Sequence, residues 1–208
     1  MIVKEQNPDF YNINGLVFIP AYDREEDIYR DLKGNVLPTV PQILRPLLTS
    51  SVYAQRIETE VHKLIEGHLK GEPYGKPFTA NCMDYLSAFH KWNDKTRPVV
   101  REAGMRLACV NFTGRFDFFG EIDGELWVID WTTEALALGL GPKLAAYAML
   151  MRGWYEQMTG KTEQINRGAL KLNSDGTYIF KKYDDLEDYE IFNHLLAVKR
   201  WKMANEQF

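Results

Sequence analysis

The sequence predicts an α/β fold in which a small mixed β-sheet is flanked by helices and preceded by N-terminal strand and helix elements. Segments 99–119 and 125–132 are rich in β-branched and aromatic residues, and the pair Asp123-Gly124 between them is typical of a two-residue hairpin loop. Amphipathic patterns with helical spacing lie on both sides of this hairpin. The order helices, β-meander, helix, strands and helix therefore favours an α/β sandwich.

The helices are predicted from their apolar stripes and their end signals. Thr39 is the expected N-cap of a short helix with Pro41 in its first turn, and a longer helix over 52–69 ends before Gly71. Further helices are expected over 79–94, 139–158 and 185–203. The apolar stripe of the 139–158 helix consists of Leu144, Tyr147, Met151 and Trp154.

Shorter strands complete the predicted sheet and an N-terminal arm. Strands near 168–172 and 177–181 flank a turn at 174–176, while an apolar run at 15–20 and a turn at 33–35 predict a hairpin or arm. With 208 residues, of which 45% are apolar, the chain is long enough to bury one sizeable core. We expect a single domain over 1–208, with 1–36 as the arm and 37–208 as the core.

Composition narrows the compartment and the chemistry. The sequence contains no run of eighteen apolar residues and its first residues lack the apolar core of a signal peptide, which predicts a soluble, cytoplasmic protein with no membrane partner. Cys82 and Cys109 have no neighbours at metal-ligand spacing. They are expected to be reduced, partly buried thiols.

The charge balance argues against a protein that coats nucleic acid without specificity. The net charge is −4 and the isoelectric point is about 5.6, whereas such coating depends on neutralising phosphates. A local basic groove is still compatible with the sequence, because many basic residues precede residue 102, namely Arg45, Arg56, Lys63, Lys70, Lys76, Lys91, Lys95, Arg97 and Arg101.

The hairpin register brings two acids together. If Asp123-Gly124 is the loop, Ile122 pairs with Glu125, and continuing the same register sets Asp117 opposite Asp130. Two opposed carboxylates repel unless one is protonated or a cation lies between them, and hard oxygen ligands favour Mg²⁺ or Mn²⁺. The alternative is that both acids are exposed to solvent, but the apolar run around Asp130 is typical of a buried strand.

The core contains five motif-like segments, namely LPTVPQIL at 37–44, TEVHKLIE at 59–66, GRFD at 114–117, VIDWTT at 128–133 and LAAYA at 144–148. Together they resemble the RecB-like, phage exonuclease-like branch of the PD-(D/E)XK nuclease superfamily. The resemblance implies a restriction-endonuclease-like core. The chain departs from the family pattern at three positions, because Glu58 replaces a glycine, Thr132 a lysine and Lys143 a glutamine.

The resemblance also implies roles for individual residues. A divalent metal, Mg²⁺ or Mn²⁺, would be held by the side chains of His62, Asp117 and Asp130 and by the backbone carbonyl of Trp131. Such a metal activates water and stabilises charge on a scissile phosphate. Tyr147 belongs to the helix motif at the same site. The DNA substrate is expected to be contacted by Arg115 and Lys63.

Thr132 raises the question of catalysis, because a lysine at that position would point to the same strand face as Asp130 and offset developing negative charge. One explanation is relocation of the cation to Lys143 or to Arg115, which the extended register sets opposite Thr132. Lys143 is the better stand-in for catalysis, since a guanidinium binds phosphate but does not act as a base. The others are an inactivating substitution, natural or engineered, and a degenerate nuclease fold.

The leading hypothesis is a metal-dependent DNA nuclease, exonuclease-like, of replication, recombination or repair, and phage-encoded in a host cytoplasm. A protein partner from a replication or recombination complex is compatible with this role. The rival hypothesis is a catalytically impaired, nuclease-like module that holds DNA or a protein. A third hypothesis is a structural accessory protein, against which the retained acidic pair argues.

Overall fold

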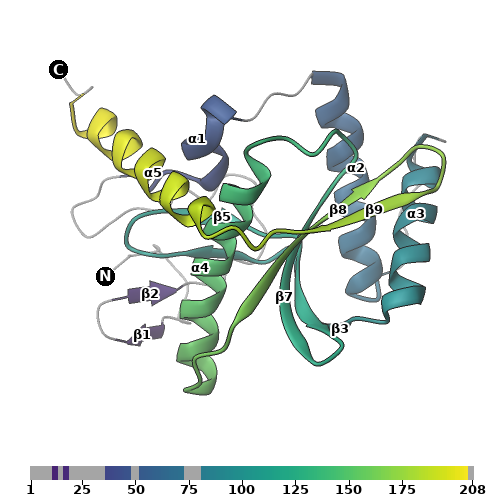
Figure 1. Cartoon of the computed structure of the whole chain (residues 1–208), viewed down its shortest axis with the longest axis horizontal. Coiled ribbons are helices and arrows are strands. Elements are labelled where there is room, and N and C mark those ends of the chain that lie inside the picture. The colour runs from purple at the N-terminus through teal and green to yellow at the C-terminus, as the bar shows by residue number, and fades with distance from the viewer. Residues whose placement is uncertain (1–10, 14–15, 19–35, 48–51, 73–80, 206–208) are drawn as a thin grey trace.

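A five-stranded mixed sheet forms the centre of the protein, as seen in a computed structural model that describes residues 11–13, 16–18, 36–47, 52–72 and 81–205 (Figure 1). The strand order is β3-β6-β7-β8-β9. The strands are β3 (Val99–Ala103), β6 (Phe118–Ile122), β7 (Glu125–Thr132), β8 (Ile165–Leu172) and β9 (Tyr178–Lys182). The predicted α/β class, with a small mixed sheet flanked by helices, is confirmed.

The helices lie on both sides of this sheet (Figure 1). On one side are α2 (Val52–Leu69) and α3 (Asn81–Thr96), and on the other are α4 (Leu140–Thr159), α5 (Glu187–Asn205) and α1 (Val40–Leu44), which a short 3-10 turn, Arg45–Leu47, extends. Thr39 caps α1 as predicted: its hydroxyl accepts a hydrogen bond from the Gln42 N–H and the Gln42 side chain accepts one from the Thr39 N–H.

The predicted β6–β7 hairpin register is confirmed from Ile122 opposite Glu125 to Phe118 opposite Ile129. The ladder ends there, one pair short of the expected opposition of Asp117 and Asp130. Gly120 introduces no register shift in this ladder; the irregularity lies on the other side, in β3 between Val100 and Glu102. A Cβ at Gly120 would lie 2.3 Å from the Val99 carbonyl oxygen, so only glycine allows β3 to approach this closely.

The segment 99–119, predicted as strand throughout, is divided by an excursion away from the main sheet. Here β4 (Arg106–Ala108) and β5 (Thr113–Arg115) form a separate two-stranded ladder in which Arg115 is opposite Arg106. The expectation that Arg115 lies opposite Thr132 was therefore wrong. The physical reason is the turn at Gly104, whose φ of 64° ends β3 and diverts the chain before β6 begins.

Strand β7 runs parallel to β8, and α4 forms the crossover between them. All residues of β7 after Glu125 are buried, as the apolar run predicted. The chain leaves the sheet at Thr132 and enters α4 at Leu140. The crossover therefore places the first turn of α4 beside the carboxyl end of β7, where Asp130 lies.

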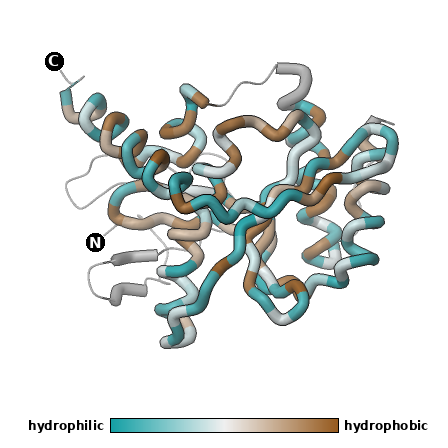
Figure 2. The backbone as a smooth tube through the Cα atoms, in the orientation of Figure 1, coloured by the Kyte–Doolittle hydropathy of each residue, from teal (hydrophilic) through white to brown (hydrophobic). Residues whose placement is uncertain are grey.

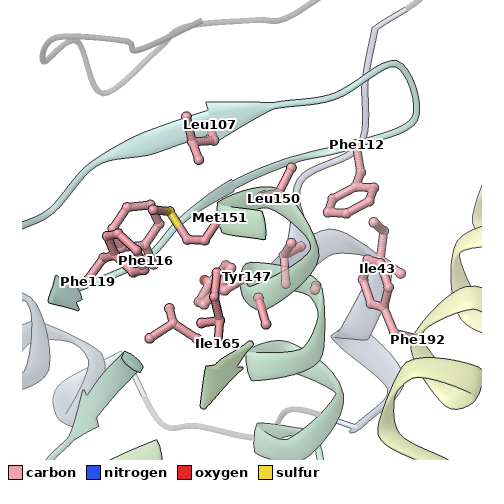
Figure 3. Packing of buried hydrophobic residues seen from close by; sticks show 14 of the residues in the cluster. Ile43, Leu107, Phe112, Phe116, Phe119, Tyr147, Leu150, Met151, Ile165 and Phe192 are labelled. Atoms are coloured by element: carbon pink, nitrogen blue, oxygen red, sulfur yellow. The ribbon is translucent and has the colours of Figure 1, made fainter. Parts of the chain in front are cut away.

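Two hydrophobic clusters cover the two faces of the sheet. The first contains Tyr147 and Met151 from α4 together with Phe116, Phe119 and Phe192, and Figure 3 shows these side chains around α4. The second cluster joins α2 and α3 to the opposite face through large aromatic and aliphatic side chains, among them Phe89, Trp92, Phe118 and Trp131. The sheet is therefore packed between two layers of buried hydrophobic side chains.

Helix α5 carries hydrophobic residues on more than one face (Figure 2). Phe192 and Leu196 are buried against the body of the protein, whereas Ile191, Val198 and Trp201 are exposed. None of the helices within the described ranges has the length and apolarity needed to cross a membrane.

The remaining predicted elements agree to within a few residues where the structure describes them. The N-terminal hairpin consists of β1 (Tyr11–Ile13) and β2 (Leu16–Phe18). The predicted turn at 33–35 and the first residues of the helix expected over 79–94 lie outside the described residues. Neither Cys82 nor Cys109 forms a disulfide with a described residue. The Cys82 thiol donates a hydrogen bond of 3.5 Å to Oε2 of Glu60, and burial raises the pKa of the Cys109 thiol.

Candidate active site

Several of the predicted site residues lie together at the carboxyl end of β7. His62 comes from α2, Asp117 from the link between β5 and β6, Asp130 from β7, and Lys143 and Tyr147 from consecutive turns of α4. The position of α2 at this end of the sheet could not be predicted from the sequence spacing alone. Packing of Val61 and Ile65, in the same turns as His62, into the second hydrophobic cluster fixes that helix face.

Asp117 is held by one side chain and one backbone group. Its Oδ1 lies 3.0 Å from Nδ1 of His62, and its Oδ2 accepts a hydrogen bond of 3.0 Å from the Trp131 N–H. The second bond ties the carboxylate to the strand that carries Asp130. The two acids therefore meet at one end of the hairpin even though the β6–β7 ladder stops before Asp117.

Asp130 is paired directly with Lys143. The Lys143 ammonium donates a hydrogen bond of 2.6 Å to Asp130 Oδ2, and Asp130 is only 2% exposed. The Lys143 side chain as a whole keeps 19% exposure. A lone carboxylate at this depth would be costly, and this lysine supplies the compensating charge.

The pKa values of these groups reflect burial and mutual charge. Burial raises the pKa of Asp130 to about 7, with Asp117 adding to the rise and Lys143 opposing it. For Asp117 burial acts in the same direction, but the adjacent His62 outweighs it and lowers the pKa. Burial opposes the charge on His62 as well, yet Asp117 raises its pKa to about 10.

Lys143 remains positively charged. Burial disfavours the ammonium, but the nearby carboxylates, Asp130 foremost, raise the pKa of Lys143 above its ordinary value. Its Nζ also lies 5.8 Å from the centroid of the Tyr147 ring. In this state Lys143 stabilises negative charge and does not act as a base.

Thr132 faces the same region without a charge. It is 7% exposed, and its hydroxyl accepts a hydrogen bond of 3.1 Å from the Glu134 N–H, which shapes the turn that leaves β7. Tyr147 is 2% exposed, and burial raises the pKa of its phenol. Its ring packs so close to Gly114 that a Cβ there would lie 2.9 Å from Cε1 of Tyr147.

Arg115 is directed to α2. Its guanidinium donates hydrogen bonds to Oε2 of Glu66, at 2.6 Å, and to the Gly104 carbonyl oxygen, at 2.9 Å. Lys63 is exposed on α2, one residue after His62. The roles of Arg115 and Lys63 in substrate binding stay predictions.

The donor set fits a hard divalent cation in its chemistry, with two carboxylates, one imidazole and the backbone at Trp131. Nε2 of His62 is buried without a hydrogen-bond partner among the described residues; Glu58 Oε1 lies 3.6 Å away. In the described part of the chain, no three His, Cys, Asp or Glu side chains are already clustered in a metal-binding arrangement. Because Lys143 Nζ already contacts Asp130 Oδ2, a metal ion would compete with this ammonium for that carboxylate oxygen.

Two residues at this site had no role assigned from the sequence. Glu58 was identified only as a replaced glycine, although its spacing of four residues from His62 places both on one helix face. Glu134 follows β7 and its Oε1 is buried with no hydrogen-bond partner in the described residues. Burial, and then the charge of Glu58, raises the pKa of the Glu134 carboxyl.

Comparisons with known proteins give similarity to solved structures only. No protein-family model matches the chain, and no curated protein matches it in sequence. A protein of Eubacterium rectale provisionally named an exonuclease has 9% identity and a TM-score of 0.47, over 81% of this chain and 74% of that one.

An alkaline exonuclease of Laribacter hongkongensis has 13% identity and a TM-score of 0.38, over 82% of this chain and 89% of that one. The same exonuclease in complex with dAMP has a TM-score of 0.36. Likenesses this distant carry no argument about activity, for which the side chains of the site must be considered.

Proposed function

We propose that this chain is a Mg²⁺- or Mn²⁺-dependent deoxyribonuclease, exonuclease-like, in which the ammonium of Lys143 replaces the lysine that the family pattern has at Thr132. The observation that carries the proposal is the 2.6 Å contact between Lys143 Nζ and Asp130 Oδ2. Through this contact α4 supplies a positive charge at Asp130, the acid that lies two residues before Thr132 on β7.

The contact supports catalysis through electrostatics. A preorganised positive charge in a site that excludes water stabilises negative charge that develops on a phosphate, and removing one such group typically reduces the rate by about 10²- to 10³-fold. Lys143 is fixed by Asp130 and borders solvent with part of its side chain. An incoming phosphodiester would meet this ammonium from the solvent side.

Asp117 and Asp130 would hold the metal, with His62 and the backbone of Trp131 beside them. When bound, a divalent cation supplies charge stabilisation and an activated water. The contact of Asp117 with the Trp131 N–H orients this carboxylate toward the strand of Asp130. Burial, with Asp117 adding to it, raises the pKa of Asp130 to about 7, and a cation bound between the two carboxylates would lower that pKa.

The test is hydrolysis of labelled single- and double-stranded DNA with Mn²⁺ or Mg²⁺, compared with EDTA. We expect cleavage by the wild type that requires the metal and is lost in Asp117→Asn, a substitution that keeps the shape of the side chain. Absence of cleavage by the wild type on every substrate, or equal traces in both proteins, would contradict the proposal.

The alternative function is a nuclease-like module that binds DNA or a protein without cutting. One observation favours it: His62 and Lys143 already neutralise Asp117 and Asp130 without a metal. DNA binding that is unchanged by EDTA, together with no hydrolysis, would identify this function. For either function, the sequence motifs support a role in replication, recombination or repair.

A further inference from the structure

A cavity of about 360 Å³ lies beside the acidic pair, and neither Lys143 nor a proposed metal ligand lines it. Its size is within the range of about 300–1,000 Å³ that is usual for small-molecule sites. The residues that line it are Glu58, Thr59, Thr132, Glu134, Ala135, Ala137 and Leu140. They come from α2, from the end of β7 and the segment after it, and from the first turn of α4.

The cavity shares its walls with the site. Thr132 and Asp130 are two residues apart on β7 and therefore point to one face of the strand. Leu140 precedes Lys143 by three residues on α4, which places both on one side of that helix. Glu58 lies 3.6 Å from His62. A DNA strand bound with its scissile phosphodiester at Lys143 would place the adjoining nucleoside at this cavity.

The lining selects against phosphate. Of the described residues that line the cavity, none is basic, and two are carboxylic acids whose charges act on one another. A terminal phosphate would be repelled there. Sugar hydroxyls and base amino groups are hydrogen-bond donors, and Glu134 Oε1 has no hydrogen-bond partner in the described part of the chain. The apolar part of the lining, Ala135, Ala137 and Leu140, suits the face of a base.

We propose that this cavity binds the terminal nucleoside of a DNA strand whose end carries a free hydroxyl and no phosphate. The inference rests on the proposed function and deepens it, because a cavity beside the scissile position that accommodates a terminal nucleoside would explain action at a strand end. Thus Glu58 and Glu134 discriminate between hydroxyl and phosphate ends.

The test measures binding without hydrolysis. Internally labelled single-stranded oligonucleotides are titrated with the wild-type protein in EDTA, and a gel shows that they remain intact. The four substrates have hydroxyls at both ends, a 5′-phosphate, a 3′-phosphate, or a closed circle. We expect at least tenfold weaker binding of the circle and of one of the two phosphorylated oligonucleotides.

Two variants test the lining. In Glu58→Gln combined with Glu134→Gln, the affinities for hydroxyl and phosphate ends should approach each other to within about threefold, because the repulsion is removed. The matched control is Glu163→Gln, which removes an exposed acid outside the cavity and should keep the discrimination. Ala135→Trp should fill the cavity and weaken binding of the hydroxyl-ended strand at least tenfold.

Leu138→Trp is the control for that filling, because Leu138 lies in the same segment, is 90% exposed and does not line the cavity. Circular dichroism verifies that each variant is folded. Equal affinity for circles and linear strands, tighter binding of both phosphorylated ends, or unchanged discrimination in the double glutamine variant would overturn the proposal. Hydrolysis in Mn²⁺ without end preference would contradict the proposed role of the cavity and support the proposed nuclease activity. End-selective binding without hydrolysis would support the role of the cavity and contradict the nuclease activity.

Discussion

Lys143 Nζ lies 2.6 Å from Asp130 Oδ2, so the buried acid of β7 is neutralised by a lysine from the first turn of α4. The crossover between two parallel strands is what permits this, because it brings the start of α4 to the carboxyl end of β7. A cation at this acid therefore does not require a lysine at Thr132. This contact is the basis of the proposal that Lys143 supplies the cation expected at position 132.

Removal of the Lys143 charge should abolish most activity. In Lys143→Gln we expect the hydrolysis rate in Mn²⁺ to fall by about 10²- to 10³-fold, as on loss of one preorganised electrostatic group. Initial rates on a labelled oligonucleotide measure this. Lys161→Gln removes an exposed lysine after α4 and is the matched control, expected to retain the wild-type rate. A wild-type rate in Lys143→Gln would show that the ammonium only neutralises Asp130.

Restoring the lysine to the strand tests relocation more directly. The combination Thr132→Lys with Lys143→Gln should regain at least tenfold of the rate lost in Lys143→Gln, because side chains two apart on a strand share a face. Thr132 borders a cavity, which leaves room for the longer side chain. Thr132→Leu with Lys143→Gln adds comparable bulk without charge, and equal rates in the two double variants would argue against relocation.

Stability of the metal-free protein should depend on the protonation of His62. Its pKa is raised from 6.5 to about 10 in the fold, so the imidazolium contact with Asp117 contributes fully below pH 6.5 and is lost as the pH rises through about 10. We expect the free energy of unfolding, from urea titrations in EDTA, to decline across this window. His62→Gln should flatten the decline, whereas His194→Gln, an exposed histidine of α5, should not.

At the acidic side the two carboxyls act in opposite directions. The lowered pKa of Asp117 means that its contribution is present above the ordinary aspartate range and is lost as the pH falls. The pKa of Asp130 is raised to about 7, so its ionisation lowers the stability of the fold as the pH rises from its ordinary pKa to 7.

The alkaline prediction for His62 has its own contrary outcome. If the stability of the wild type and of His62→Gln declined in parallel above pH 6.5, the alkaline decline could not be assigned to this histidine.

The local signals of the sequence predicted most of the fold. The turn pair Asp123-Gly124 gave the correct β6–β7 register because both residues have a positive φ, 52° and 81°, which suits that pair. The same reasoning failed for Arg115, since it assumed that the strand continues past the turn at Gly104. Register propagates only as far as the ladder, and its end is decided by tertiary packing.

The site was predictable where motifs mark it and not where distant elements meet. The motifs identified His62, Asp117, Asp130 and Lys143, and the structure brings all four together. The proposed roles of Glu58 and Glu134 depend on how α2 packs against the end of β7, a contact between parts of the chain more than seventy residues apart. No local pattern encodes that approach.

A divalent metal should stabilise the folded protein if Asp117 and Asp130 bind it. A ligand that binds only the native state raises the free energy of unfolding by about 2.7 kcal/mol at a concentration of 100 times its Kd. We therefore expect Mn²⁺ to raise the melting temperature of the wild type but not of Asp130→Asn, and calorimetric titration should show binding in the first protein alone. Equal shifts in both would place the metal elsewhere.

Gly114 should tolerate no side chain, because α1 and α4 close over it. A Cβ at this position would lie 2.9 Å from Cε1 of Tyr147, 3.0 Å from Cγ2 of Val40 and 3.1 Å from Cδ1 of Leu150, all in the buried core. Overpacking of this kind costs about 1–3 kcal/mol. We expect Gly114→Ala to lower the free energy of unfolding by that amount in urea titrations. Combining it with Leu150→Ala should recover part of the loss if the clash is the cause, whereas additive destabilisation would attribute the effect of Gly114→Ala to the backbone of β5.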